Sequence, residues 1–398
     1  MNRSVCVLRQ SYFPEEAHVR KNVDALTDAG FAVDVVCLRA PGEPARERYR
    51  DGIVHRLPLT HKRRGTLRYL FEYATFLLMA AVLLTARSVR RRYDIVEVYN
   101  IPDALALAAL PARLLGSKII FYMFELMPEQ AADEWELPAD HALVRRLRWL
   151  ERLAVRIADR VITVSPYDRD VVQRRDAPRS APAVIPNVPE ERLFNARRSV
   201  QPVARNGVFR ILTHGSILRR YGIQTLVRAL PHLLERIPRV ELTVLGEGEY
   251  RSDLAALSRE LGVEDCVRFP GWIAHEDVPS EIARADVGVV PASVPWLLPN
   301  KLFEYVAMGK PVVAAASPSL SAVFSNDCIA YFWPDDERDL ARRILELYED
   351  RSRAQRLATN ALRAFDAYRW ERVRETYVAL HEELLTGKRP LHPHEEAA

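Results

Sequence analysis

The residues best suited to chemistry lie in a run that begins at Pro299. The run starts as a loop, continues into a helix that Gly309 ends, and passes into an apolar strand. The first amide N–H groups of a helix have no partner within it, so they can bind an anion. The backbone of Asn300, Lys301 and Leu302 is therefore a predicted anion site.

Glu304 lies one turn further along the same predicted helix. Its carboxylate could accept hydrogen bonds from a diol such as the ribose of a nucleotide. It could instead stabilise the dipole of the helix from its first turns without touching a ligand. The pattern alone leaves both interpretations open.

Two glycine turns follow predicted strands in the same half of the chain. Gly215 and Ser216 come after one strand, with Arg219 and Arg220 shortly behind them, and Gly246 comes after the next strand. Glycine lets the backbone approach a phosphate closely, and arginine supplies positive charge. Each turn alone could be an ordinary strand-to-helix connection, and the second lacks the third glycine of a dinucleotide fingerprint. Together with the helix above, they favour a nucleotide site.

In the first half, Glu125 follows the predicted strand 118–122. Ligands of doubly wound sheets bind at the carboxyl ends of the strands, where a carboxylate could orient an acceptor hydroxyl. The alternative is a loop glutamate paired with a nearby arginine.

No pattern in the sequence predicts a metal site. Asp168 and Asp170 form a D-x-D pair, but Ser165 and Pro166 before them are typical of a helix start, where acidic residues are common. The four cysteines are far apart and form no C-x-x-C pair, so we expect neither zinc nor disulfides, and a reducing cytoplasm fits.

Apolar runs that suit buried parallel strands alternate with helical periodicity through both halves. The runs are residues 5–8, 31–38, 95–98, 118–122 and 161–164, and then 210–213, 240–245, 267–269, 287–290 and 311–315. Strands separated by helices predict an α/β protein with two Rossmann-like, doubly wound domains facing a cleft.

The domains are expected at particular positions. We predict an N-terminal domain over residues 1–190, a polar linker over 191–208 and a C-terminal domain over 209–368. Residues 369–386 are predicted to form a helix that crosses back to the N-terminal domain, and residues 387–398 a loose tail.

Composition excludes several classes of protein. The chain has 398 residues, of which 48% are hydrophobic and 28% charged, unlike a disordered or collagen-like chain. A net charge of +4 argues against nucleic acid as a partner. Residues 1–200 carry 32 Lys and Arg against 25 Asp and Glu, which suits an anionic partner or simply a solvated surface.

Residues 69–86 form an apolar segment that Glu72 interrupts and basic residues flank. A membrane-spanning helix needs about 20 apolar residues, so a buried or interfacial helix is favoured over a spanning one. The basic flanks suit anionic headgroups. We therefore expect a cytoplasmic protein that can bind peripherally to the inner face of a membrane.

Several short motifs recur in order along the chain. The second half contains HGSILRRYG at 214–222, LGEG at 245–248, FPGW at 269–272, ADV at 285–287 and EYVAMGKPVV at 304–313. The first half contains YDIV at 93–96, ADRVITVS at 158–165 and IPNV at 185–188, and YRWE follows at 368–371. This set resembles the retaining glycosyltransferases of family four, which have the GT-B fold.

The resemblance implies a nucleotide-diphosphate sugar as donor, bound by the C-terminal domain, and a sugar or lipid-linked acceptor. The donor is a substrate, and no separate cofactor is implied. The implied donor-binding residues are Gly215, Ser216, Gly246, Trp272, Asn300, Lys301, Leu302 and Glu304. Glu125, Arg219 and Arg220 are the implied catalytic residues, the arginines because they would neutralise the departing diphosphate. The expected role is bacterial polysaccharide, glycolipid or glycoside synthesis.

Four positions depart from the family pattern. Ser216 and Tyr221 stand where the family has arginine and lysine, Trp296 replaces the first of two glutamates, and Phe124 replaces a histidine. These departures motivate an alternative, a non-catalytic GT-B subunit that serves another transferase. A sugar-nucleotide epimerase or a phosphorylase on the same scaffold is a third possibility, although no motif for a pyridoxal phosphate lysine is present.

Overall fold

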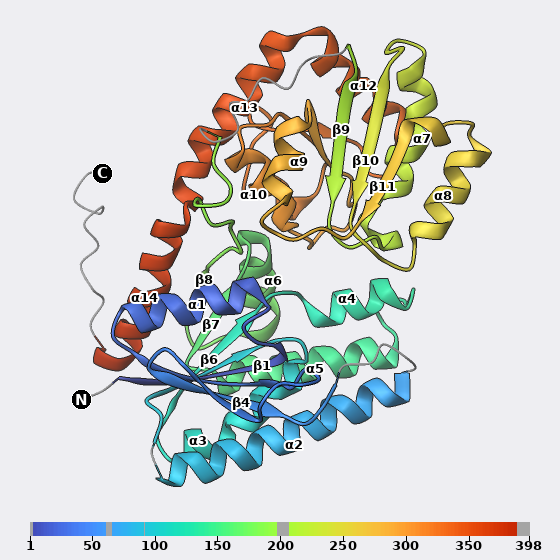
Figure 1. Cartoon of the computed structure of the whole chain (residues 1–398). Coiled ribbons are helices and arrows are strands. Elements are labelled where there is room, and N and C mark those ends of the chain that lie inside the picture. Colours follow the sequence, from blue (N-terminus) through green and yellow to red (C-terminus); the bar gives the residue numbers. More distant parts are fainter. Residues whose placement is uncertain (1–2, 61–65, 91, 197–206, 388–398) are drawn as a thin grey trace. The chain divides into compact units, whose positions relative to one another are not determined.

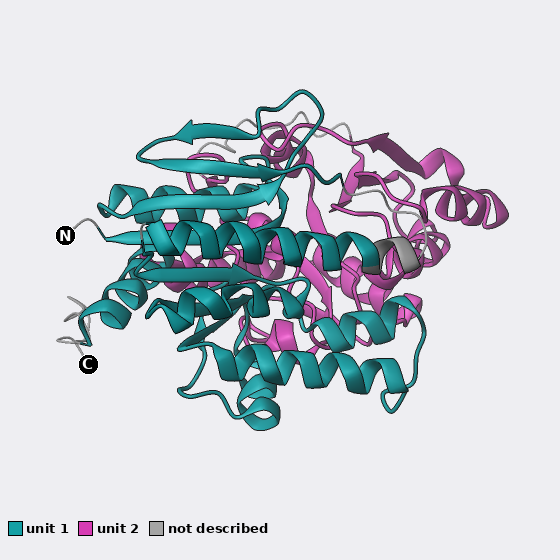
Figure 2. Cartoon of the chain, turned by 90° about the horizontal axis from the view of Figure 1, so that it is seen from below, with its two compact units in different colours: residues 1–186, 373–398 teal, residues 187–372 magenta. Residues whose placement is uncertain are grey.

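The computed structural model of the protein describes residues 3–60, 66–90, 92–196 and 207–387 (Figure 1). The chain forms two compact units, coloured separately in Figure 2. Unit 1 comprises Met1–Pro186 and Val373–Ala398, and unit 2 comprises Asn187–Arg372. The C-terminal helix is therefore grouped with the first part of the chain.

Unit 1 is built on an eight-stranded sheet in the order β3-β4-β2-β1-β5-β6-β7-β8. Neighbouring strands are parallel except β3 and β4. The strands are β1 (Ser4–Tyr12), β2 (Ala32–Leu38), β3 (Arg46–Tyr49), β4 (Gly52–Leu57), β5 (Ile95–Tyr99), β6 (Lys118–Met123), β7 (Arg160–Thr163) and β8 (Ala183–Val184). Strands β5 and β6 are buried along almost their whole length, and β1 over residues 4–8, because helices cover both faces of the sheet.

Helices α1 and α14 lie on one face of this sheet, and α2 and α3 lie on the other (Figure 1). The helical elements are α1 (Ala17–Asp28), α2 (Thr66–Arg90), η1 (Asp103–Ala109), α3 (Leu110–Leu114), α4 (Met127–Glu134), α5 (Ala142–Ile157), α6 (Pro166–Asp176) and α14 (Trp370–Thr386). Helix α6 begins as its sequence predicts, because Ser165 accepts a hydrogen bond from the Asp168 amide and proline occupies the first turn.

A buried polar cluster ties α14 to β5. Tyr377 Oη donates to Glu97 Oε2 at 2.6 Å, and His381 Nε2 lies 3.0 Å from the same oxygen. Glu97 and His381 are fully buried. A buried carboxylate needs such partners, so these contacts account for the grouping of α14 with unit 1.

Unit 2 has a six-stranded, all-parallel sheet in the order β11-β10-β9-β12-β13-β14. The strands are β9 (Phe209–His214), β10 (Val240–Leu245), β11 (Val267–Gly271), β12 (Val287–Val290), β13 (Val312–Ala315) and β14 (Ala330–Phe332). The helical elements are η3 (Arg219–Tyr221), α7 (Ile223–Leu234), α8 (Arg251–Glu260), η4 (Glu264–Cys266), α9 (Val278–Arg284), α10 (Asn300–Ala307), α11 (Pro318–Ser321), α12 (Glu337–Glu349), α13 (Arg351–Phe365) and η5 (Asp366–Tyr368). One apolar core joins β9 and β10 to α7, α8 and α12.

The predicted α/β class with two doubly wound units is confirmed. Four strands, β3, β4, β8 and β14, lie outside the predicted runs. Strand β3, for example, consists of exposed or half-buried polar residues. Within the predicted linker, Phe194 is buried and its ring lies 5.2 Å from that of His275 in unit 2. The remainder of the linker, residues 197–206, and the predicted tail from 388 lie outside the described residues.

Candidate functional site

The two glycine turns of unit 2 lie side by side at the carboxyl end of its sheet. Leu245 of β10 pairs with His214 of β9, which sets the glycines that follow these strands next to each other. A Cβ atom on Gly246 would lie 2.0 Å from the Gly215 carbonyl oxygen, and the φ angles are +131° and +112°. Only glycine fits this backbone without strain, so the turn keeps a surface free of side chains.

Helix α10 begins beside these turns. Its N-cap residue is Pro299, which has no side-chain hydrogen-bonding group, so no side chain caps the first turn of α10. Asn300 is exposed, whereas Lys301 and Leu302 are buried. The Leu302 amide donates to the Pro299 carbonyl oxygen at 3.1 Å, so the prediction that it binds an anion is not supported. At this end of α10 the amides of Asn300 and Lys301 are therefore the ones that can serve an anion site.

A close fit holds α10 against the sheet. Tyr305 Oη donates to the Leu212 carbonyl oxygen of β9 at 3.2 Å. On β12, a Cβ atom at Gly288 would lie 2.5 Å from the Tyr305 ring. The missing side chain at Gly288 is what lets the tyrosine, and with it the whole helix, approach the strands.

Glu304 lies in the second turn of α10, and no acidic residue occupies the first turn. Glu304 is therefore not a first-turn residue placed to stabilise the dipole of α10. Glu304 Oε2 lies 3.2 Å from His214 Nε2, and only about a tenth of each side chain is exposed. Burial, helped by the nearby Lys301 ammonium, holds the pKa of His214 well below its ordinary value. The imidazole is neutral at pH 7, so the carboxylate keeps its charge uncompensated by His214.

Lys301 is a buried cation at the same place. Its side chain is 7% exposed, and its Nζ lies 5.5 Å from the centre of the Tyr221 ring. Nζ is also 3.7 Å from the position that a Cβ of Gly215 would take. Among the described residues, no hydrogen bond or ion pair reaches this ammonium. Burial lowers the pKa of Lys301 to about 8, although the Glu304 carboxylate opposes the shift.

The other predicted donor-side residues surround this group less closely. Ser216 and Arg219 are exposed, and the Arg220 guanidinium carbon lies 5.6 Å from the centre of the Tyr221 ring. Trp272, directly after β11, is 75% exposed. The structure thus brings Gly215, Gly246, Lys301 and Glu304 together. Asn300 and Leu302 lie in the first turn of α10, Arg219 and Arg220 in η3, and Ser216 and Trp272 in the segments that follow β9 and β11.

Two of the departures from the family pattern have a structural account. Tyr221 packs against the apolar core of unit 2 and offers its ring to both Lys301 and Arg220. Two cations therefore lie beside the position at which the family pattern has lysine. Trp296 is buried, with 5% of its surface exposed. Lys301 was predicted for its backbone alone; its spacing of three residues from Glu304, which puts both on one helix face, is the signal for its side chain.

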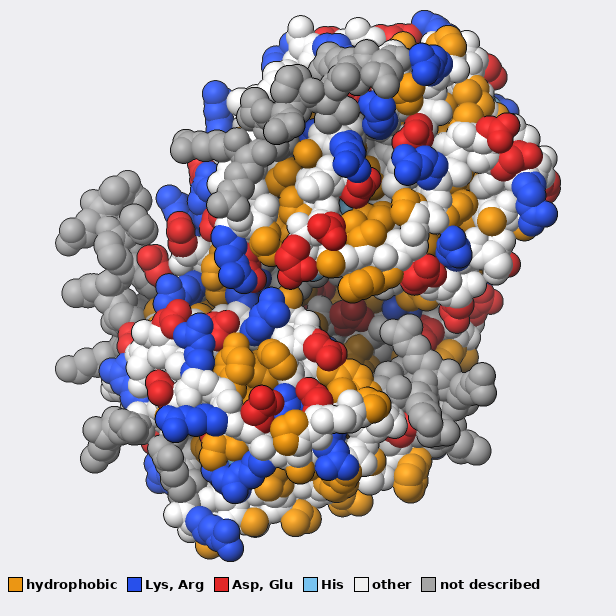
Figure 3. Space-filling model, viewed as in Figure 1, with side chains coloured by type: hydrophobic (Ala, Val, Ile, Leu, Met, Phe, Trp, Pro, Cys, Tyr) orange, Lys and Arg blue, Asp and Glu red, His pale blue; other side chains and the backbone are white. Residues whose placement is uncertain are grey.

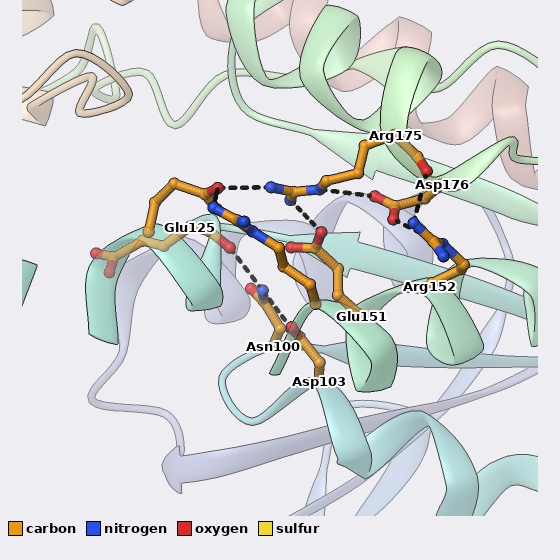
Figure 4. A network of polar contacts seen from close by, with 9 residues as sticks. Asn100, Asp103, Glu125, Glu151, Arg152, Arg175 and Asp176 are labelled. Atoms are coloured by element: carbon orange, nitrogen blue, oxygen red, sulfur yellow. Dashed lines mark hydrogen bonds and ion pairs between the residues drawn. The ribbon is translucent and has the colours of Figure 1, made fainter. Parts of the chain in front are cut away.

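In unit 1, Glu125 is half-buried in the loop after β6. Asn100, which the sequence did not single out, fixes this loop (Figure 4). Its Nδ2 donates to the Glu125 carbonyl oxygen at 2.7 Å, and its Oδ1 accepts from the Phe124 amide at 2.7 Å. Asn100 Nδ2 also donates to Asp103 Oδ1 at 2.9 Å. Asn100 is therefore a positioning residue for Glu125.

A partly buried cluster of charges lies beside this loop (Figure 4). Arg175 pairs with Glu129, Glu151 and Asp176, and Arg152 pairs with Asp176 at 3.8 Å. Burial raises the pKa of Asp103 to about 7 and that of Glu151 well above its ordinary value. Within the described parts of the chain, no group of three or more histidine, cysteine or acidic side chains is arranged to hold a metal ion.

Two Rossmann-like units in one chain, the second with this site at its strand ends, define a GT-B protein. Residues 16–188 match the family described as glycosyl transferase 4-like domain, and residues 208–350 match glycosyl transferases group 1. The chain belongs to the group 1 glycosyltransferases.

Known proteins similar to the chain agree with this family. Lipopolysaccharide core biosynthesis glycosyltransferase LpsE of Rhizobium meliloti is 35% identical over 37% of this chain and 42% of its own length. The chain spans about half the length of the curated relatives it matches. Sucrose-phosphate synthase from Thermosynechococcus elongatus has a TM-score of 0.81 at 22% identity, covering 97% of this chain and all of that one. Anabaena HepE in complex with UDP and glucose has a TM-score of 0.71 at 17% identity, covering 96% and 99%.

Proposed function

We propose that this protein is a glycosyltransferase that moves a sugar from a nucleoside-diphosphate sugar to an acceptor, with retention at the anomeric carbon. The observation that carries the proposal is that the buried residues Lys301 and Glu304 lie on one face of α10, beside the glycine turns. A cation, a carboxylate and bare backbone are the groups that a nucleoside diphosphate needs.

Each group has a distinct task in the proposed reaction. The Gly215 and Gly246 backbones allow the diphosphate to approach, and the first amides of α10 donate to its oxygens. Lys301 balances negative charge on the diphosphate as the sugar leaves, with Arg219 and Arg220 at the rim, and such preorganised charge stabilises the transition state. Glu304 accepts hydrogen bonds from the ribose.

The printed names of similar proteins support a donor and acceptor class. The HepE structure is described as a complex with UDP and glucose. LpsE is named as a glycosyltransferase of lipopolysaccharide core biosynthesis. We therefore propose a nucleotide-sugar donor and a sugar or lipid-linked acceptor in bacterial polysaccharide or glycolipid synthesis, with Glu125 orienting the acceptor hydroxyl. All four cysteines are free, which suits action in the reducing cytoplasm.

Calorimetry with UDP and GDP on the purified full chain tests the donor site. We expect one of the two to bind, and Glu304→Gln to weaken it about tenfold or more, because the ribose loses a charged acceptor. Glu260→Gln, an exposed residue of α8, is the matched control and should bind as the unaltered chain does. Failure of the unaltered chain to bind any nucleoside diphosphate would overturn the proposal. Binding without release of sugar from any donor would favour the non-catalytic subunit instead.

A further inference from the structure

Helix α2 of unit 1 exposes an apolar stripe to solvent. Phe71, Leu78, Val82 and Val89 have between 64% and 71% of their surface exposed. They recur at intervals of seven, four and seven residues, which places them on one face of the helix. From Phe71 to Arg90 the helix is long and apolar enough to cross a membrane by length and composition alone.

The stripe continues onto α3, which packs beside α2. Leu110 and Leu114 of α3, and Leu115 at its end, are also exposed. Of the eleven large hydrophobic side chains exposed in the described residues, seven therefore lie on these two adjacent helices. Such a concentration exceeds what a water-facing surface usually carries and indicates an interaction face. Figure 3 shows hydrophobic side chains along the margin of unit 1 where α2 and α3 run.

The opposite side of α2 packs in the core of unit 1. Phe76, Ala80 and Leu84 are almost fully buried. Near the end of the helix, Arg87 Nη2 pairs with Asp34 Oδ2 at 2.8 Å. A spanning helix would have to withdraw these groups from the unit, so α2 can lie on a bilayer but cannot cross one as packed here.

Positive charge borders this face. Arg90, Arg92 and Lys118 are exposed, and in the part of the chain described none of them pairs with a carboxylate. The Arg92 guanidinium lies beside Gly116, directly after α3. The one acidic residue of the two helices, Glu72, is buried. In the sequence, Lys62, Arg63 and Arg64 precede the helix.

We propose that the α2–α3 face docks on the surface of an anionic phospholipid bilayer, with its apolar side chains in the headgroup layer and its cations on lipid phosphates. The combination of an apolar stripe with exposed cations that pair with no carboxylate among the described residues decides between occupants. A second copy of this face would bring like charges together, which disfavours a dimer, whereas anionic lipid complements both features. The inference does not depend on the donor site, which lies in the other unit.

Sedimentation of the full chain with vesicles tests the proposal. We expect binding to vesicles of equal parts phosphatidylcholine and phosphatidylglycerol, weak binding to phosphatidylcholine alone, and release as salt is raised. The double variant Leu78→Glu/Val82→Glu should bind about tenfold more weakly or worse, because two carboxylates enter the headgroup layer. The double variant Arg90→Gln/Lys118→Gln should bind these vesicles about 25-fold more weakly, because each basic residue near an anionic surface contributes about fivefold to the affinity.

Trp333→Glu supplies the matched control, because Trp333 is 70% exposed but lies in unit 2. It should sediment with vesicles as the unaltered chain does, and circular dichroism should show every variant folded. Equal binding of the Leu78→Glu/Val82→Glu variant, or equal binding to neutral vesicles, would overturn the proposal. A second result would also overturn it: the unaltered chain forms a dimer in analytical ultracentrifugation and does not bind vesicles, and the Leu78→Glu/Val82→Glu variant is a monomer.

Discussion

At the scale of single residues, Lys301 is the most informative side chain. A lysine ammonium seldom lies buried without an anionic or hydrogen-bonding partner, because burial penalises its charge. Within the described residues, an aromatic ring and the Glu304 carboxylate are what compensate the charge of Lys301. A bound diphosphate would supply the missing partner and restore the pKa toward its ordinary value.

Lys301→Met should weaken UDP or GDP binding about tenfold to a hundredfold, because a charge-assisted contact to phosphate is lost. Uridine or guanosine, which lack phosphates, should bind the variant as they bind the unaltered chain. Lys118→Met, an exposed lysine of unit 1, is the control. Equal loss for nucleoside and nucleotide, measured by calorimetry, would mean that Lys301 supports the fold rather than the phosphates.

The pH dependence of binding follows from the same residue. The pKa of Lys301 is lowered to about 8, so the ammonium is present below that pH and lost above it. Nucleoside-diphosphate affinity should therefore hold steady to about pH 7 and fall as pH rises through about 8 to 10, with the bound anion shifting the fall upward. In Lys301→Arg the guanidinium does not titrate in this range, so the decline should vanish. A decline of equal size in that variant would assign it to another group.

At the scale of elements, the close approach of α10 to the sheet depends on Gly288, which has a hydrogen atom where other residues have a side chain. Gly288→Ala would place a methyl carbon against the Tyr305 ring. We expect a loss of about 1–3 kcal/mol in the free energy of unfolding, as in other overpacked cores, and a weaker nucleotide affinity because α10 is displaced. Urea denaturation measures the first effect and calorimetry the second. Gly288→Ala/Tyr305→Leu should recover part of both losses if the clash is the cause.

The sequence predicted these elements unevenly. Apolar runs such as Val240–Leu245 predict parallel strands because both faces of the sheet are buried, and the structure confirms them. The hairpin strand β3 consists of polar residues, so its pairing with β4 follows from tertiary context that no local pattern carries. Likewise, spacing puts Lys301 and Glu304 on one helix face, but only the fold reveals that His214 of β9 lies against Glu304. Asn100 had no signal at all, since its role rests on a loop 25 residues away.

At the scale of the whole molecule, the return of α14 to unit 1 makes that unit discontinuous in sequence. Tyr377→Phe should lower the free energy of unfolding by about 1–3 kcal/mol, because Glu97 remains buried with one hydrogen bond fewer. Tyr348→Phe, a half-buried tyrosine packed on the core of unit 2, is the control and should change it little. Equal losses in both variants under guanidinium chloride would show that the Tyr377 hydroxyl has no special part in holding α14.

The same discontinuity has a consequence for biosynthesis. As the ribosome extends the chain, all eight strands of the first sheet emerge long before residues 373–386, which must cover β5. Until then, Glu97 lacks the Tyr377 hydroxyl and the His381 imidazole that contact it. Domains generally mature in the order of their synthesis. Here the later unit has all its parts first, and the earlier one is complete only when α14 has left the exit tunnel.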